Sequence, residues 1–380
     1  MRLPPFLLDQ WLDQKNSPDA KIEFDLGSST GPVWTLRELL ALEENDLGAL
    51  LDTRLLYNTP AGTPELRGLI GAIHGVDPEC VQVLTGSAEA LLILFFLAAG
   101  PDANVVLPSP GFPANTALAE AFGIEVRAYA LRAENAFRID PDEIRSLVDR
   151  NTRLVLVNSP HNPTGAVIGD AEMQSLHDLC ADRGVQFVSD EVYHPIYHGL
   201  FDHDVESRTA ARLPHATVLG DFSKALCLSG LRTGWIVDRD AARRKRYLNA
   251  RSYFTISNTA LGEPLAALAL RNREAIYGPV RNVAGRNLAL LDRVFSENSE
   301  ILKWVRPSGG MTAFPWLADG GDGREFCQRL AKSGVLMAPG DCFGMRSHFR
   351  VGFAASGDRF AQALDQFAKF LSSETRTAAV

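Results

Sequence analysis

The chain of 380 residues is 46% hydrophobic and 22% charged, an ordinary globular composition and long enough for a large core and two domains. Its 38 basic and 46 acidic residues give a net charge of −8, which argues against nucleic acid or an anionic membrane as a partner. No apolar run reaches the roughly 18 residues of a membrane-spanning helix, and the first residues lack the apolar segment of a secretory signal.

The cysteines argue against a metal centre. The chain has five, and none is part of a C-x-x-C pair: Cys80, Cys180, Cys227, Cys327 and Cys342. Cysteine-based zinc sites usually show such pairs, so we expect no bound metal. An odd number of scattered cysteines is typical of reduced thiols, which predicts a cytoplasmic location.

Short valine-rich segments alternate with helical segments from about residue 80 to residue 240. We expect strands, each bounded by turn signals, at residues 81–85, 104–108, 125–131, 153–159, 185–190, 217–221 and 234–238. The clearest helices between them are 88–98 and 171–184. This alternation predicts an α/β fold, with a three-layer α/β/α large domain built on a mostly parallel seven-stranded sheet.

The pattern changes at both ends of the chain. A long polar helix at 274–297 leads to short strands near 311–316 and 348–353, which predicts a smaller α+β domain over residues 276–380. Residues 46–275 form the large domain. The first 45 residues lack a strand–helix alternation of their own, so we expect this N-terminal segment to pack with the small domain.

Polar residues follow several of the expected strands, at the edge of a parallel sheet where ligands bind. Gly86 and Ser87 follow the first strand, Asn162 follows a later one, and Asp190 and Lys224 follow the next two. We therefore expect these side chains to surround one site.

Lys224 lies within VLGDFSKALCLSGLRTGW (218–235) and has two interpretations. It is either a solvated charge or a buried amine of lowered pKa that condenses with an aldehyde. Asp190 closes an apolar strand, so it either caps the next helix or pairs with a cation such as a protonated pyridine nitrogen. Tyr193 either packs or donates to a phenolate oxygen.

The remaining candidates suit a flat, phosphorylated ring. In TGSAEAL (85–91), the backbone amides of Gly86, Ser87 and Ala88 open a helix and form an anion site, which Arg232 could complete. The loop NSPHNPTG (158–165) holds Asn162 rigidly, and Phe112 either stacks on a ring or fills the core. A phosphorylated pyridine aldehyde would use all of these groups together.

In this order the motifs resemble the fold-type I, pyridoxal-phosphate-dependent class I/II aminotransferases, over roughly residues 20 to 355. The similarity rests on DLGSSTGP (25–32), YNTPAGTPELR (57–67), TGSAEAL, PGFP (110–113), NSPHNPTG, SDEVYH (189–194), PSGGMTAFPW (307–316), APGDCFG (338–344) and FRVGF (349–353), together with Ser223, Lys224 and Arg232.

The resemblance implies a role for each candidate. Lys224 would form the imine with the cofactor and shuttle the proton, and Asp190 would pair with the ring nitrogen. The other implied cofactor contacts are Gly86, Ser87, Ala88, Ser223 and Arg232 on the phosphate, Asn162 and Tyr193 on the ring oxygen, and Phe112 stacked on the ring. Tyr57 would reach the phosphate of a partner subunit, which implies a homodimer. Gly27, Asn162 and Arg350 would bind the substrate, although Arg350 alone would be read as a surface salt bridge.

Two positions depart from the pattern of the family. Asp221 replaces the usual Ser or Thr three residues before the lysine, where an ionised carboxylate would repel a phosphate. It turns towards Arg232 or a backbone donor, or one phosphate contact is absent. Asn115 stands where many relatives carry an aromatic residue, which predicts a more polar pocket there.

The expected activity is transfer of an amino group between an L-amino acid and a 2-oxo acid. The alternatives are β-elimination, oxidative or cyclising chemistry on arginine-like substrates, and a non-catalytic ligand-sensing domain. Arg251 and Arg271 are the candidate receptors for a side-chain carboxylate of the substrate, and the side chain that the enzyme accepts stays open.

Overall fold

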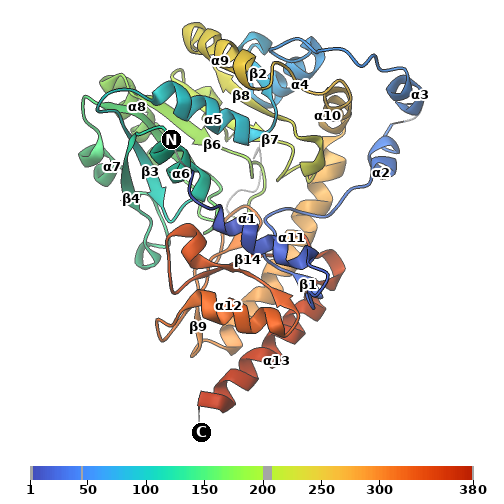
Figure 1. Ribbon diagram of the computed structural model, residues 1–380, viewed down its shortest axis with the longest axis vertical. Helices are drawn as coiled ribbons and strands as arrows, with labels where there is room; N and C mark the ends of the chain where they lie inside the picture. Colours follow the sequence, from blue (N-terminus) through green and yellow to red (C-terminus); the bar gives the residue numbers. More distant parts are fainter. Residues whose placement is uncertain (1–2, 44–45, 200–207, 379–380) are drawn as a thin grey trace.

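A seven-stranded sheet forms the centre of the larger part of the molecule in the computed structural model, which describes residues 3–43, 46–199 and 208–378 (Figure 1). Its strands are β2 (Val81–Leu84), β3 (Asn104–Ser109), β4 (Glu125–Ala130), β5 (Thr152–Asn158), β6 (Gln186–Asp190), β7 (Ala216–Asp221) and β8 (Gly234–Asp238). Their order is β2-β8-β7-β6-β5-β3-β4, and β8 alone runs antiparallel to its neighbours. All seven predicted strands are confirmed, each within one residue at either end.

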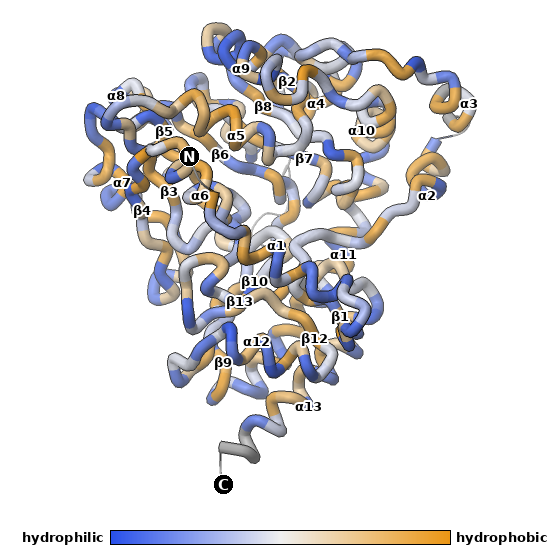
Figure 2. The backbone as a smooth tube through the Cα atoms, in the orientation of Figure 1, coloured by the Kyte–Doolittle hydropathy of each residue, from blue (hydrophilic) through white to orange (hydrophobic). Residues whose placement is uncertain are grey.

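Helices cover both faces of this sheet: α4 (Pro64–His74), α5 (Ser87–Ala98), α6 (Pro113–Ala121), α7 (Pro141–Leu147), α8 (Asp170–Arg183), α9 (Ala241–Phe254) and α10 (Gly262–Arg271). Successive strand residues point to opposite faces. Val105 and Leu107 therefore pack in the same apolar cluster as α5, whereas Val106 packs in a second cluster with Leu176 of α8. Apolar segments occur in both layers and in the strands between them (Figure 2). The predicted three-layer α/β fold is confirmed.

A smaller part follows the long helix α11 (Arg273–Glu297). It consists of short strands and two helices: β9 (Leu302–Lys303), β10 (Thr312–Ala313), β11 (Trp316–Leu317), α12 (Gly323–Lys332), β12 (Val335–Leu336), β13 (Ala338–Pro339), β14 (Phe349–Gly352) and α13 (Phe360–Ala378). Strands β10, β14 and β13 form an antiparallel sheet in that order. Strand β14 is important for function because it carries Arg350.

The N-terminal segment contacts both parts of the molecule. It contains α1 (Leu7–Leu12), β1 (Phe24–Asp25) and α2 (Leu36–Leu40), and α3 (Asp46–Leu51) follows the gap in the described residues. Strand β1 pairs in parallel with β12, and Trp11 Nε1 donates to the Met337 carbonyl at 2.8 Å. Further along, Glu43 pairs with Arg271 at the end of α10. The predicted boundary at residues 45/46 touches the part outside the described residues, and the division into domains stays a prediction.

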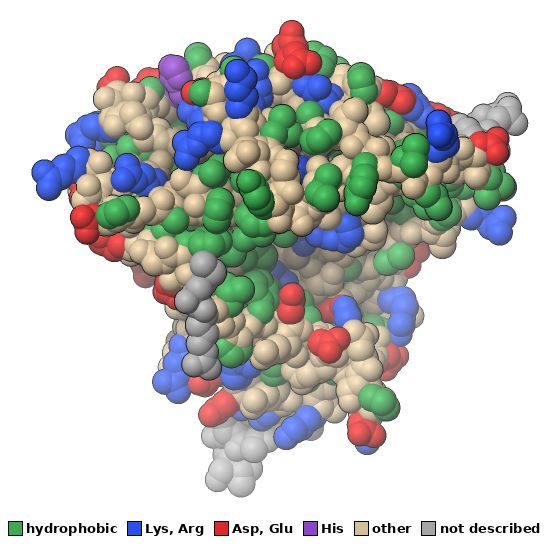
Figure 3. All heavy atoms as spheres, turned by 45° about the horizontal axis from the view of Figure 1, so that its top comes forward, with side chains coloured by type: hydrophobic (Ala, Val, Ile, Leu, Met, Phe, Trp, Pro, Cys, Tyr) green, Lys and Arg blue, Asp and Glu red, His purple; other side chains and the backbone are tan. Residues whose placement is uncertain are grey.

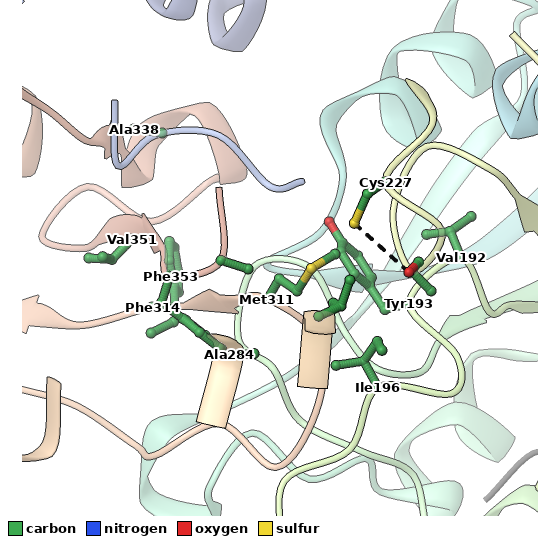
Figure 4. Close-up of a cluster of buried hydrophobic side chains, with 14 of the residues drawn as sticks. Val192, Tyr193, Ile196, Cys227, Ala284, Met311, Phe314, Ala338, Val351 and Phe353 are labelled. Atoms are coloured by element: carbon green, nitrogen blue, oxygen red, sulfur yellow. Dashed lines mark hydrogen bonds between the residues drawn. The ribbon is translucent and has the colours of Figure 1, made fainter. Parts of the chain in front are cut away.

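Buried apolar side chains join the two parts beneath the sheet edge (Figure 4). Tyr193 and Cys227 come from loops of the large part, and Met311, Phe314 and Phe353 come from the small part. This continuous core holds β14 close to the carboxyl ends of β5, β6 and β7. Among the described residues, no helix has both the length and the apolar character that crossing a membrane requires.

Candidate active site

A cavity of about 270 Å³ lies at the carboxyl edge of the sheet, between the large part, β14 and the N-terminal segment. Most of the predicted site residues line it: Ser87, Phe112, Asn162, Asp190, Tyr193, Lys224 and Arg350. Larger hollows elsewhere on the described residues contain none of them. The topology therefore gathers residues that are spread over more than half of the chain.

Lys224 follows β7 and reaches into the cavity, where its Nζ donates to Ser29 Oγ at 2.9 Å. Ser29 belongs to the glycine loop DLGSSTGP, and the sequence interpretation did not single it out. The sequence feature that could have identified Ser29 was the pair of hydroxyl residues next to Gly27. Lys224 is therefore held by a side chain of the N-terminal segment, 195 residues earlier in the chain.

Asp190, at the end of β6, is a buried carboxyl that forms no ion pair with any described residue. Burial raises its pKa to about 7. The Val192 amide, which donates to Oδ1 at 3.3 Å, and the charge of Lys224 act in the opposite direction. A cation placed beside this carboxyl would favour its ionised form.

Asn162 is positioned by a residue that the sequence interpretation missed. The Asn158 side chain accepts from the Asn162 amide at 2.7 Å and donates to the Asp190 carbonyl at 2.9 Å. It therefore ties the rigid loop after β5 to the end of β6. Asn158 is the first residue of the motif NSPHNPTG. A second side-chain amide in the same motif as Asn162 was the sequence feature that could have identified it.

Arg350 is buried at the bottom of the cavity with only 1% of its surface exposed, so reading it alone as a surface salt bridge would be wrong. Its Nη1 donates to Asn162 Oδ1 at 3.0 Å and its Nη2 to the Gly27 carbonyl at 2.6 Å. The guanidinium carbon lies 4.9 Å from the centre of the Phe343 ring. Burial lowers the pKa of this guanidinium.

Two buried polar atoms at the cavity have no partner among the described residues. They are the Tyr193 hydroxyl and Arg350 Nε. A buried donor without a partner costs about 1–3 kcal/mol, so such atoms mark positions where a polar ligand would be favoured.

The junction of β2 and α5 has the form of an anion site. Gly86 adopts a φ of +78°, and the amides of Ser87 and Ala88 begin the helix without a backbone partner among the described residues. A Cβ at Gly86 would lie 2.8 Å from Arg232 Nη2, which places the guanidinium against this turn.

Asp221 is also present at this junction. Its carboxylate accepts from the Ser87 hydroxyl at 2.9 Å and from the Ser223 amide at 2.8 Å. The carboxylate therefore turns to a backbone donor, as one of the predicted alternatives stated, and also to the Ser87 hydroxyl.

The N-terminal helix covers one side of the cavity. Leu8, Asp9 and Leu12 of α1 line it together with Phe112. Phe112 caps the start of α6 and meets the ring of Phe6 edge to face, with 6.0 Å between the ring centres. This side of the cavity is thus closed mainly by apolar groups, with Asp9 among them.

Several predicted residues do not line this cavity. Those that lie next to a lining residue are Gly27, Gly86, Ala88 and Ser223, and Arg232 lies against Gly86. Four others lie away from it. Tyr57 is 80% exposed, and Asn115 is buried within α6 without lining the cavity, so the expected polar pocket at Asn115 is wrong. Arg251 is buried against the carbonyls of Pro60 and Val83, and Arg271 pairs with Glu43 and Glu65. Neither arginine can receive a substrate carboxylate in this arrangement.

Comparison with known proteins agrees with this geometry. Residues 26–368 match the family described as aminotransferase class I and II. The chain belongs to the class I and II aminotransferase family. It is 31% identical to a capreomycidine synthase of Streptomyces vinaceus, over 98% of this chain and 95% of that protein. It is 30% identical to an aspartate/prephenate aminotransferase of Thermus thermophilus, over 85% of each.

A solved structure confirms the fold of the family member. A PLP-dependent aminotransferase from Streptococcus suis superposes with a TM-score of 0.89 and 26% identity, covering 98% of this chain and 99% of that one. The protein is a pyridoxal-phosphate-dependent aminotransferase. The residues present fit that cofactor, because a buried carboxyl, an amine, an unpartnered phenol and an anion site surround one cavity.

Proposed function

We propose that this cavity transfers an amino group between an L-amino acid and a 2-oxo acid, with Lys224 as the catalytic base. Pyridoxal phosphate supplies an aldehyde for the amino group and a ring that takes up electrons when the Cα proton leaves. Lys224 Nζ would hold the cofactor at its aldehyde carbon, and the same amine would accept the proton that leaves Cα of the substrate. The observation that carries the proposal is the convergence of Lys224, Asp190 and Arg350 on one cavity.

Asp190, Asn162 and Tyr193 would hold the ring. Asp190 would keep the ring nitrogen protonated, because a cation would stabilise its buried carboxylate. The Asn162 amide and the otherwise unpartnered Tyr193 hydroxyl would donate to the ring oxygen. Phe112, which lines the same cavity, would pack against the ring.

The start of α5 would hold the phosphate. Ser87 and Ala88 would offer backbone amides, whereas the Gly86 amide donates to the Leu84 carbonyl at 2.9 Å, and Ser223 and Arg232 would complete the site. The helix dipole favours an anion at this end of α5.

Arg350 receives the α-carboxylate of the substrate. Its guanidinium is already oriented by Asn162 Oδ1 and the Gly27 carbonyl, and a carboxylate would gain a charge-assisted pair with it. Nothing among the lining residues selects one amino acid side chain over the others.

The active form is a homodimer with shared sites. Leu55, Leu56 and Tyr57 are 80%, 61% and 80% exposed, respectively, a run of apolar surface that a second copy of the chain would cover. Hydrophobic side chains are common over the part of the surface that Figure 3 presents. Tyr57 would then reach the phosphate of the partner subunit. A cytoplasmic location also belongs to the proposal, supported by five free cysteines.

The test is to add a panel of amino acids to the purified holoenzyme and follow the absorbance of the cofactor. Conversion to the amino form of the cofactor, with release of a 2-oxo acid, is expected for at least one amino acid. Lys224→Ala should remove the adduct that borohydride traps in the wild type. No conversion with any amino acid, or an adduct that survives in Lys224→Ala, would contradict the proposal.

A second candidate is oxidative or cyclising chemistry on an arginine-like substrate. The 31% identity to a capreomycidine synthase over nearly the whole chain favours it. The same panel separates the two candidates, because transamination needs a 2-oxo acid acceptor for turnover and oxidation consumes dioxygen. Turnover of an arginine derivative without an acceptor would favour the second candidate.

A further inference from the structure

Asp221 is a buried acid inside the proposed phosphate site, and the mechanism above does not use it. It ends β7, is only 6% exposed, and forms no ion pair with any described residue. Its two oxygens accept from the Ser87 hydroxyl at 2.9 Å and the Ser223 amide at 2.8 Å. The Ser87 hydroxyl and the Ser223 amide, which both lie at the proposed phosphate site, are therefore already directed at a carboxylate.

The carboxylate cannot leave this position without cost. Turning away would leave the buried Ser223 amide without its acceptor, which costs about 1–3 kcal/mol. An ionised phosphate oxygen beside an ionised carboxylate would repel it. One proton between the two oxygens changes the repulsion into a short charge-assisted hydrogen bond.

We propose that Asp221 accepts a hydrogen bond from a protonated oxygen of the cofactor phosphate, so that the site selects the singly charged phosphate ester. This inference rests on the proposed function. The charged groups around this site are Asp190 on β6, which feels the charges of both Asp221 and Lys224, and Arg232 from the loop before β8, whose guanidinium lies against Gly86. Arg232 would hold the phosphate, and Asp221 would set how many protons it carries.

The consequence is a cofactor affinity that depends on pH. A phosphate monoester loses its second proton with a pKa of about 6. Above that pH the singly charged form becomes about tenfold scarcer for each pH unit, and the affinity of the wild type falls with it. A serine at position 221 would donate to the doubly charged phosphate instead.

The experiment measures the dissociation constant of pyridoxamine 5′-phosphate, whose amine does not condense with Lys224, at pH 6.5 and pH 8.5. The cofactor-free wild type is compared with Asp221→Ser and Asp221→Asn. Removing the charge of Asp221 also lowers the pKa of Asp190. The readout is therefore the ratio of wild-type to variant dissociation constants, divided by the same ratio for pyridoxamine without its phosphate. We expect this ratio to rise at least tenfold between the two pH values.

A ratio that stays constant with pH overturns the inference, whereas failure of every protein to bind the compound overturns the proposed function instead. Pyridoxamine without its phosphate is the matched control, because its ratio reports the effect of Asp221 on Asp190 alone. Titration calorimetry at pH 8, in buffers of different ionisation enthalpy, is a second measurement. The wild type should take up about one proton more on binding than Asp221→Ser does, because Asp190 and the ring nitrogen contribute to both. Equal proton uptake by the two proteins contradicts the inference.

Discussion

Asp190 is the side chain whose charge depends most directly on whether the cavity is filled. Burial, together with the neighbouring charges of Asp221 and Glu191, raises its pKa to about 7. In the cofactor-free protein its ionised form is therefore costly near neutral pH. The ring cation that the proposed function places beside it would remove this cost.

The first prediction is that Asp190→Asn stabilises the cofactor-free protein at high pH while it lowers activity. A free aspartate has a pKa of 3.8, so the folded protein holds the proton more tightly than the unfolded chain does. The free energy of unfolding of the wild type therefore falls as pH rises from about 4 to about 7, by about 1.4 kcal/mol per unit and on the order of 4 kcal/mol in all. Urea unfolding at pH 5 and pH 8 measures how the free energy of unfolding changes with pH in the wild type and in Asp190→Asn.

The control is the same substitution at an exposed acid, Asp182→Asn on α8. It should leave the pH dependence of unfolding unchanged. Glu191 contributes to the same pH range in all three proteins, because burial also raises its pKa to about 7. An Asp190→Asn variant with the pH dependence of the wild type would contradict the prediction.

Individual residues show how far the sequence could lead. The candidates at strand ends were predictable, because parallel strands bring their carboxyl ends to one edge. The partners of Asp221 were not predictable, because Ser87 lies 134 residues away and local sequence does not report such contacts. The burial of Arg350 depends in the same way on Phe343 and the Gly27 loop closing around it.

At the scale of elements, β8 joins the anion site to the sheet. It pairs antiparallel with β2, and Gly234 lies opposite Leu84. A Cβ at Gly234 would lie 2.7 Å from both the Gly86 carbonyl carbon and the Ser87 amide nitrogen. These are backbone atoms of the turn that begins α5, so they cannot rotate aside as a side chain would.

The second prediction is that Gly234→Ala damages both stability and phosphate binding. The added methyl group must push β8 away from the start of α5, and overpacking of this kind costs roughly 1–3 kcal/mol. The dissociation constant of pyridoxamine 5′-phosphate should rise, because the Ser87 amide moves. Urea unfolding and a binding titration measure the two effects. Gly285→Ala in α11, where a Cβ meets nothing within 4 Å, should change neither by more than a small amount.

The elements of the sheet were predictable but their order was not. Each strand is a short valine-rich run between turn signals, and this pattern located all seven within one residue at each end. The place of β8 between β2 and β7, and its reversed direction, depend on contacts distant in sequence, such as Trp235 packed over Gly220. Helices α1 to α3 carry no comparably strong periodic pattern.

At the scale of the whole molecule, apolar side chains are exposed in two segments far apart in sequence. Leu55 and Tyr57 lie in the first, and Tyr253 and Ile256 lie in the second, near the end of α9. Asn58 links the two segments, because its Nδ2 donates to the Thr259 carbonyl at 3.1 Å. Together they form an apolar surface that a second copy of the chain would bury.

The last prediction concerns the sharing of sites between two chains. Tyr57 is exposed and does not line the cavity of its own chain, so its proposed contact with the phosphate must be made in the partner subunit. The Lys224→Ala protein should be inactive, and the Tyr57→Ala protein should have weakened activity. When the two proteins are unfolded together and refolded, they should therefore form mixed dimers in which one of the two sites has neither substitution. Random association would leave about a quarter of all sites intact. The activity at limiting cofactor should rise above the mean of the two separate proteins.

Adding Leu55→Asp to both chains should abolish this gain by placing a charge in the apolar surface. Activity equal to the mean of the two proteins would show that Tyr57 does not act across the interface.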